Sequence, residues 1–257
     1  MRKIVLSFDD ARSDFYTRAF PILKNYNLPA SLNVISGYVN GKAKISFPSS
    51  ATGMTVEQVV ECQHSGLVEI ACHGANHQNT RRDVELNIEE LIAMGIDVSS
   101  IGFASPQSEI TEVNLNNEGI GDLLNESKLS YVRSGIQIRR EGFLYILLSL
   151  LDRYFHRKEL YWILNKRNIF NCVKTIIPSA AVFSHTTCEQ LQSFIEKMPD
   201  ENCIIFMFHS ILDTIDDGYG KDRYYWDVTR FEKICSWISK NEDVNVCTTK
   251  EIVLGSK

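Results

Sequence analysis

The sequence lacks the features that mark disulfide-bonded, exported or membrane-spanning proteins. Its seven cysteines form an odd, scattered set without a C-x-x-C pair, which suits small apolar core residues in a reducing compartment. No apolar run reaches the length of about 18 residues that a membrane-spanning helix needs. The four apolar residues that follow Met1 in the first ten are too few for the hydrophobic region of a signal peptide. These absences lead us to expect a cytoplasmic protein.

A surplus of basic residues, internal repeats and low-complexity segments are also missing. The net charge of −5 gives no general case for binding nucleic acid. Apolar residues make up 44% and charged residues 23% of the 257 residues, as in ordinary globular proteins with a sizeable core. Length and composition therefore predict one α/β domain over residues 1–257.

Short apolar runs alternate with amphipathic segments of helix length along the chain. Strands are predicted at residues 3–8, 30–35, 67–71, 101–104, 129–132, 173–177, 203–208 and 244–247. Helices are predicted at residues 15–26, 55–64, 84–94, 115–124, 188–197 and 230–239. Pro21 predicts a break near residues 19–20, and Thr55 is the expected N-cap of the second helix. This order predicts a mainly parallel sheet, either open or closed into a barrel.

Sites in such folds lie at the carboxyl ends of the strands, and four predicted strand ends carry chemically useful residues. Asp9 and Asp10 follow the first strand. Two adjacent carboxylates repel each other unless a cation or a proton lies between them, and a metal ion would supply that charge. The alternative is a turn in which one of the aspartates caps the next helix.

Histidines or a rigid loop follow the other three strands. His73 and His77 come four residues apart and can face one metal ion, or they can be two surface histidines on a polar loop. His209 can be a general acid or base, or a hydrogen-bonded core histidine. Ser105 precedes Pro106 in a loop that can offer a main-chain N–H to an oxyanion, or that is an ordinary turn.

In order and spacing, these four segments resemble the motifs of the polysaccharide deacetylases, also called the NodB-homology superfamily or carbohydrate esterase family 4. Residues 7–11 resemble the motif T-F-D-D-G, and residues 66–77 resemble G-x-x-E-I-x-x-H-[ST]-x-x-H. Residues 103–107 resemble the third motif, and residues 207–209 resemble the final L-x-H. The resemblance spans most of the chain outside residues 139–171, and it implies a distorted (β/α) barrel of about seven strands.

The resemblance also implies a role for each residue. Three side chains would bind one divalent metal: Asp10, His73 and His77. Zn²⁺ suits this ligand set best, with Co²⁺, Ni²⁺ or Fe²⁺ as alternatives. Asp9 would be the general base, His209 the general acid, and the main-chain N–H of Gln107 would help to hold the oxyanion.

The sequence departs from the family pattern at three points. Ala104 stands where the best-known members carry an arginine that pairs with the base aspartate, so the pKa of Asp9 should rise unless another cation compensates. Arg133, expected just after the fifth strand, is a candidate for that cation, and a surface arginine is the alternative. Gln107 and Ser108 replace an aromatic residue and a glycine, which alters the sugar-facing wall. The fourth motif, an Asp-Trp element that orients the general acid, has no clear match.

Residues 139–174 form an unusual basic segment. Its eight Lys and Arg against three Asp and Glu give a net charge of +5, which leaves the remainder of the chain at −10. Residues 143–151 within it are nearly all apolar, yet too few to span a bilayer. We treat the segment as an insertion at about 139–172. It could rest on an anionic membrane surface, form a buried helix that covers the barrel, or take part in a dimer interface.

Three functions agree with these observations. The first is a metal-dependent hydrolase that removes an N-acetyl group from a carbohydrate, an intermediate of a cell-surface glycan. The second is hydrolysis of an O-acetyl ester or of a non-sugar C–N bond on the same scaffold. The third is a catalytically weak carbohydrate-binding homologue, which the altered third motif and the missing fourth motif favour.

Overall fold

Seven parallel strands close into a barrel in the computed structural model, which describes residues 1–50, 52–135, 143–171 and 176–255. The strands are β1 (Arg2–Phe8), β2 (Ala30–Val34), β3 (Val68–Cys72), β4 (Phe103–Ala104), β5 (Val132–Gly135), β6 (Ile176–Ala181) and β7 (Cys203–Phe208). They pair in sequence order, and β7 returns to pair with β1 along most of its length. A further parallel strand, β10 (Val244–Val246), pairs with the beginning of β1. The predicted distorted (β/α) barrel is confirmed.

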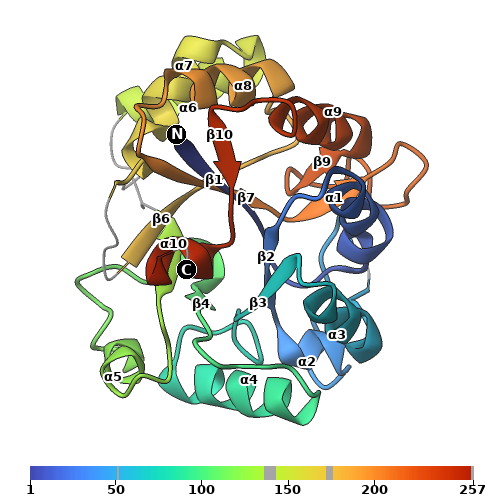
Figure 1. Cartoon of the computed structure of the whole chain (residues 1–257), viewed down its shortest axis with the longest axis vertical. Helices are drawn as coiled ribbons and strands as arrows, with labels where there is room; N and C mark the ends of the chain where they lie inside the picture. Colours follow the sequence, from blue (N-terminus) through green and yellow to red (C-terminus); the bar gives the residue numbers. More distant parts are fainter. Residues whose placement is uncertain (51, 136–142, 172–175, 256–257) are drawn as a thin grey trace.

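Helices surround the barrel (Figure 1). They are α1 (Phe20–Tyr26), α2 (Ser36–Val39), α3 (Val56–His64), α4 (Arg81–Ala93), α5 (Ile120–Asn125), α6 (Phe143–Phe155), α7 (Lys158–Asn165), α8 (Cys188–Lys197), α9 (Val228–Ile238) and α10 (Thr249–Leu254). The short helix α10 lies across the end of the barrel where the strands begin, because the Thr249 and Lys250 N–H groups donate to Ser31 and Glu69. That end is closed, so the carboxyl ends of the strands are left for a site.

Local sequence signals explain several element boundaries. A π-helix, η1 (Phe15–Ala19), precedes α1, and the change from one helix to the other falls at the break predicted from Pro21. Thr55 caps α3 in a capping box with Gln58, as the sequence predicts. The predicted boundaries of α8 and β7 are those of the structure.

Two predicted elements lie elsewhere. The helix predicted at residues 115–124 begins only at Ile120, because Asn114 and Thr111 bond locally in a turn and Gly119 has a φ of 70°. The strand predicted at residues 129–132 is shifted to Val132–Gly135. Its apolar run ends where the strand begins, and the polar residues that follow, Arg133 and Ser134, are buried. The first residues of the strand predicted at 173–177, and Cys172 before it, lie outside the described residues. The six other cysteines are free and buried.

The alternation of side chains along β1 separates two parts of the core. Ile4, Leu6 and Phe8 face the helices in the larger apolar cluster. Val5 points the other way, into a smaller cluster inside the barrel with residues such as Tyr131. Ser7 also points inward and accepts a hydrogen bond from Asn33. The barrel interior therefore becomes polar toward the carboxyl ends of the strands, where a site can form.

The capping box of α3 allows a test of the helix boundary. Thr55 Oγ1 accepts a hydrogen bond from the Gln58 N–H at 3.3 Å, and the Gln58 side chain accepts one from the Thr55 N–H at 2.9 Å. We expect Thr55→Ala to lower the free energy of unfolding by about 1 kcal/mol. In a protein of this size the Tm should fall by about 2–4 °C in differential scanning calorimetry. Thr55→Ser is the control and should keep the wild-type Tm, and an unchanged Tm in the alanine variant would contradict the assignment.

Candidate metal centre

Asp9 and Asp10 directly follow β1 and bind different partners. Both carboxylate oxygens of Asp9 accept hydrogen bonds from Arg133 Nη2 at 2.8 Å, and Oδ1 accepts another from the Asn33 amide at 2.7 Å. Asp10, whose φ is 77°, accepts hydrogen bonds from Arg12 through Oδ2 at 2.8 Å. Each carboxylate thus has its own buried arginine, and the alternative of helix-capping aspartates is wrong.

These partners keep both carboxylates ionised. Burial raises the pKa of Asp9, but the charges of Arg133 and His73 outweigh burial and hold that pKa below its ordinary value. Burial also opposes ionisation of Asp10, whereas its hydrogen bond with His73 and the charge of Arg12 hold its pKa well below the usual range. The end of β1 therefore carries two negative charges at neutral pH.

The structure brings together the three side chains that the sequence singled out as metal ligands. Asp10 Oδ1 lies 3.4 Å from His73 Nε2 and 3.7 Å from His77 Nε2. The three donor atoms all lie within 4.8 Å of one another. Two donors that are each about 2.1 Å from one tetrahedral ion lie about 3.4 Å apart. One carboxylate and two imidazoles at this spacing fit a small divalent cation such as Zn²⁺.

His73 is oriented for this position by its other ring nitrogen. Its Nδ1 lies 2.8 Å from the main-chain oxygen of Ala104 in β4. A carbonyl oxygen only accepts, so Nδ1 carries a proton, and Nε2, which faces Asp10, is the ring nitrogen that can bind a cation once it has no proton of its own. His73 is 2% exposed, so the alternative of a surface histidine is wrong for this residue.

The loop between the two histidines is organised by Asp83 in the first turn of α4. Its carboxylate accepts hydrogen bonds from the main-chain N–H groups of Asn76 and Gln78 and from the Asn76 side chain. Gly74 in this loop has a φ of 78°, and a Cβ atom there would lie 2.6 Å from Asp83 Oδ2. The loop therefore depends on glycine at 74 and on the carboxylate at 83.

The two histidines differ in their tendency to hold a proton. Burial and the neighbouring His73 lower the pKa of His77 to about 4, so its ring is neutral at neutral pH. Burial also disfavours the charged form of His73, but Asp9 and Asp10 outweigh burial and raise its pKa. A cation that binds here has to displace a proton from His73 at pH values below that raised pKa.

His209 lies directly after β7, beside the same carboxylates. Its ring packs against Tyr224, with ring centroids 5.0 Å apart. Burial lowers its pKa, although Asp10 and Asp9 act in the opposite direction. Its Nδ1 is buried and has no hydrogen-bond partner among the described residues, so the alternative of a hydrogen-bonded core histidine does not describe this nitrogen. No aspartate orients the ring from that side within the described part of the chain.

Arg133 lies within β5, whereas the sequence analysis expected it just after the fifth strand. The guanidinium is 1% exposed, so the alternative of a surface arginine is wrong. Besides Asp9, it donates to Ser179 Oγ in β6 at 3.0 Å. It brings its charge to Asp9 from a different strand than the arginine that Ala104 replaces. The rise in the pKa of Asp9 expected without that arginine is therefore absent.

The loop after β4 carries Gln107 near the mouth of the barrel. Gln107 is exposed and has a φ of 55° within the short 3₁₀ turn η2 (Pro106–Ser108). Asn79 ties this loop to the histidine loop, because it donates to the Pro106 oxygen and accepts from Ser105 Oγ. The oxyanion role of the Gln107 N–H stays a prediction.

Sequence reasoning missed Arg12, Asn33, Asp83 and Tyr224. Arg12 follows Asp10 by two residues, and it also donates to Ser49 and Ser210 and stacks on a phenylalanine ring. A basic residue so close to two aspartates was a usable signal. The others carry no local signal, because each reaches the site from a separate element.

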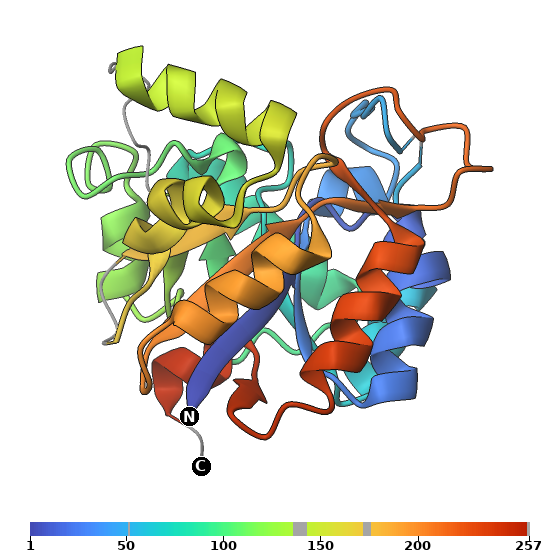
Figure 2. The same cartoon turned by 90° about the horizontal axis from the view of Figure 1, so that it is seen from above.

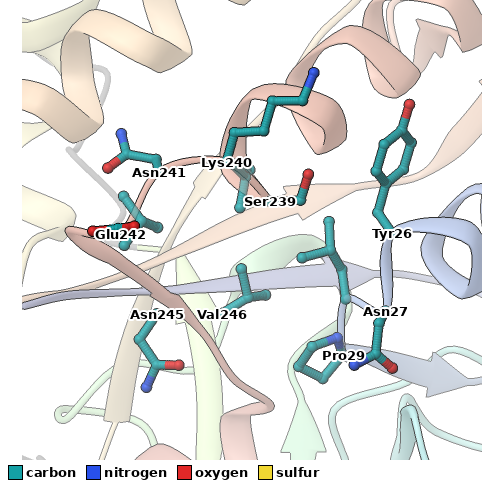
Figure 3. A pocket seen from close by; sticks show the side chains of 12 residues that line it. Tyr26, Asn27, Pro29, Ser239, Lys240, Asn241, Glu242, Asn245 and Val246 are labelled. Carbon is teal, nitrogen blue, oxygen red and sulfur yellow. The ribbon is translucent and has the colours of Figure 1, made fainter.

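The surface also has a groove that is separate from the candidate metal centre. An open groove lies between the turn from α1 to β2 and the segment from α9 to β10, lined by residues such as Tyr26, Pro29, Lys240 and Val246 (Figure 3). Because β10 pairs with the beginning of β1, the groove lies at the end of the barrel away from Asp10.

A closed parallel barrel with an Asp-His-His cluster at the carboxyl ends of its strands defines the class of the protein as a (β/α) barrel with a candidate metal centre. Comparison with known protein families then identifies the family of this chain. The polysaccharide deacetylase family matches residues 1–137, and the chain belongs to this family.

Individual relatives agree with this assignment. The chain is 36% identical over 81 residues to poly-beta-1,6-N-acetyl-D-glucosamine N-deacetylase of Escherichia coli K12, covering 29% of this chain and 12% of that protein. The match thus spans only a small part of the length of that relative.

Solved structures show the same fold. A putative polysaccharide deacetylase from Mycobacterium smegmatis aligns with a TM-score of 0.58 and 12% identity over 98% of this chain and 89% of that chain. A family 4 acetyl xylan esterase from Clostridium thermocellum, solved with a cobalt ion, aligns with a TM-score of 0.51 and 17% identity over 97% and 89%. At this identity the likeness concerns the fold alone.

Removal of one candidate ligand tests the metal centre. We expect the wild-type protein to bind one Zn²⁺ per chain in isothermal titration calorimetry. His77→Ala should weaken binding more than about 100-fold, beyond the effect of losing an outer hydrogen bond to a ligand. His64→Ala is the matched control, because His64 is exposed on α3 and distant in the fold. Equal affinity in the wild type and in the His77 variant would exclude this centre.

Proton competition gives a pH dependence with a defined sign. His73 has a raised pKa without metal, and only its neutral ring can bind a cation. Zn²⁺ affinity should therefore increase with pH up to that raised pKa and level off above it. Below it the affinity should fall up to about tenfold per pH unit, with about one proton released per ion. Calorimetry in buffers of different ionisation enthalpy measures this number, and affinity that is constant from pH 5 to 7 would contradict the assignment.

Proposed function

We propose that the chain is a metal-dependent N-deacetylase that acts on a carbohydrate, an intermediate of a cell-surface glycan. The observation that carries this proposal is the convergence of Asp10, His73 and His77 with Asp9 beside them, 4.0 Å from His73 Nε2. Membership in the polysaccharide deacetylase family supports the substrate class. The Escherichia coli relative, named for N-deacetylation of a β-1,6-linked N-acetylglucosamine polymer, supports an N-acetylated sugar.

The residues of the chain suit the steps of amide hydrolysis. Asp10, His73 and His77 would hold a divalent ion, which when bound lowers the pKa of a water molecule and polarises the acetyl carbonyl. Asp9, kept ionised by Arg133, would accept the proton of the attacking water. The Gln107 N–H would donate to the oxyanion, and His209 would protonate the departing nitrogen.

The alternative of a catalytically weak homologue rested partly on the missing arginine at position 104. Arg133 takes its place by donating from Nη2 to both carboxylate oxygens of Asp9, which removes that reason. The lack of a described partner for His209 Nδ1 remains as its support. Acetate release separates the possibilities. An N-deacetylase releases acetate from N-acetylglucosamine oligomers, an esterase only from O-acetylated sugars, and a binding protein from neither.

The role proposed for His209 can be tested through the leaving group. An amine leaves only with a proton, whereas 4-nitrophenolate leaves without one. We expect His209→Ala to lower kcat for an N-acetylated oligosaccharide by about 10²–10⁴-fold with little change in KM. Cleavage of 4-nitrophenyl acetate should fall much less in the same variant.

An equal loss on both substrates would contradict the acid role and indicate structural damage. Tyr224→Phe serves as a control for packing, because it keeps the ring that contacts His209. That variant should retain most of the activity on both substrates.

A further inference from the structure

The helix α6 carries an exposed apolar face on the outside of the molecule. Five of them recur at helical spacing on one face, and all are exposed: Phe143, Ile146, Leu147, Leu150 and Tyr154. Phe143 is 82% and Tyr154 80% exposed. The one buried residue of this helix is polar, Asp152, which lies on the opposite face. Tyr145 and Leu148, which share the side of Asp152, are half-buried, so α6 is apolar on both sides and its outer apolar face is left uncovered.

Contacts on the inner face hold α6 to the protein without using the apolar face. Asp152 accepts a hydrogen bond of 2.8 Å from the Gln190 side chain of α8. The neighbouring helix α7 packs against both α6 and α8. No side chain of α6 belongs to either apolar cluster of the described residues. The expected alternative of a buried helix that covers the barrel is therefore wrong.

Exposed positive charge lies on α6 and directly after it. Residues 143–171 contain five Lys and Arg against two Asp and Glu, while the whole chain has a net charge of −5. Arg153 on α6 and Arg157 and Lys158 just beyond its end are all exposed. An apolar strip beside exposed cations matches the acyl and headgroup layers of an anionic bilayer.

We propose that the outer face of α6 docks the protein on an anionic membrane surface, with the helix lying parallel to the bilayer. With 13 residues α6 is about 20 Å long, and within the described residues no helix has the length and hydropathy to cross a bilayer. Binding to the interface is the mode that this length and polarity allow. This inference does not depend on the proposed enzymatic activity.

The docking surface lies at the end of the molecule that holds the metal centre. Figure 2 shows α6 on the side opposite the two termini, and β1 runs from the N-terminus toward that side. A row of ring contacts joins the end of α6 to His209, through His156, His185, Phe183 and Tyr224. A membrane beneath α6 would therefore lie beside the mouth of the barrel.

Charge favours a membrane over a second copy of the chain. A symmetric dimer through α6 would bring identical basic flanks together, since each subunit contributes the same patch. Like charges placed across an interface oppose association. An anionic lipid surface can bury the apolar part of this face among its acyl chains and pair the cationic part with its headgroups.

Vesicle co-sedimentation of the full chain tests the proposal. The wild-type protein should bind vesicles of phosphatidylcholine with 30% phosphatidylglycerol at low salt, and bind vesicles of pure phosphatidylcholine at least about tenfold more weakly. Binding should also decrease with added salt. Leu150→Glu and the double variant Arg153→Glu/Arg157→Glu should each lose at least about tenfold in partition coefficient.

The matched control is Ile92→Glu on α4. Ile92 is 55% exposed and Leu150 58%, so both changes place one negative charge at an exposed apolar helical position. The control should bind vesicles like the wild type, and all variants should keep the wild-type Tm and metal binding.

Failure of the wild type to sediment with anionic vesicles would overturn the proposal, as would an equal loss in the control. Light scattering without lipid measures the molar mass of the protein and so tests whether a second copy of the chain covers this face instead. A wild-type dimer that Leu150→Glu converts to a monomer would assign the face to a second copy and also overturn membrane docking. Acetate release from a soluble substrate is measured separately, so a loss of vesicle binding with intact activity distinguishes this proposal from the enzymatic one.

Discussion

The division of charge at the end of β1 is the interaction on which the site depends. Two adjacent buried aspartates stay ionised because each has its own arginine, Arg133 for Asp9 and Arg12 for Asp10. Arg12 binds only Oδ2 of Asp10, so Oδ1 remains turned toward the two histidines. Without these arginines burial would drive one carboxyl to hold a proton, and the oxygen that faces the histidines would lose its charge.

The same balance sets the charge that a bound cation would add. Two carboxylates and two guanidiniums cancel, so with neutral histidines the centre carries no net charge before any ion binds. A divalent ion would then leave it positive at the position where amide hydrolysis develops an oxyanion. A surplus of carboxylates would bind the cation more strongly but offset this positive charge. The pairing of Asp9 with Arg133 therefore favours the developing negative charge, in addition to keeping the base ionised.

Sequence patterns predict the parts of this protein that local physics determines. The helix at 188–197 and the strand at 203–208 have their predicted bounds, because a Thr187 cap and an uninterrupted apolar run define them. The candidate ligands were visible because a barrel collects the residues that follow its strands. The strand at 132–135 was displaced in the prediction, since Arg133 and Ser134 look like surface residues and are instead buried. Partners such as Asn33 depend on long-range contacts that no local pattern records.

The exposed apolar face of α6, like the burial of Arg133, depends on long-range contacts that the local sequence does not record. Apolar periodicity predicts a face that leaves water, but it does not say what covers that face. In most helices the core of the same chain covers it, whereas here a hydrogen-bonded Asp152 turns toward the protein. The fold therefore holds α6 by the side that carries Asp152 and leaves the opposite apolar face exposed. If the proposed activity acts on a lipid-linked glycan, this arrangement would bring the sugar to the candidate metal centre at the membrane surface, because the face lies beside the mouth of the barrel.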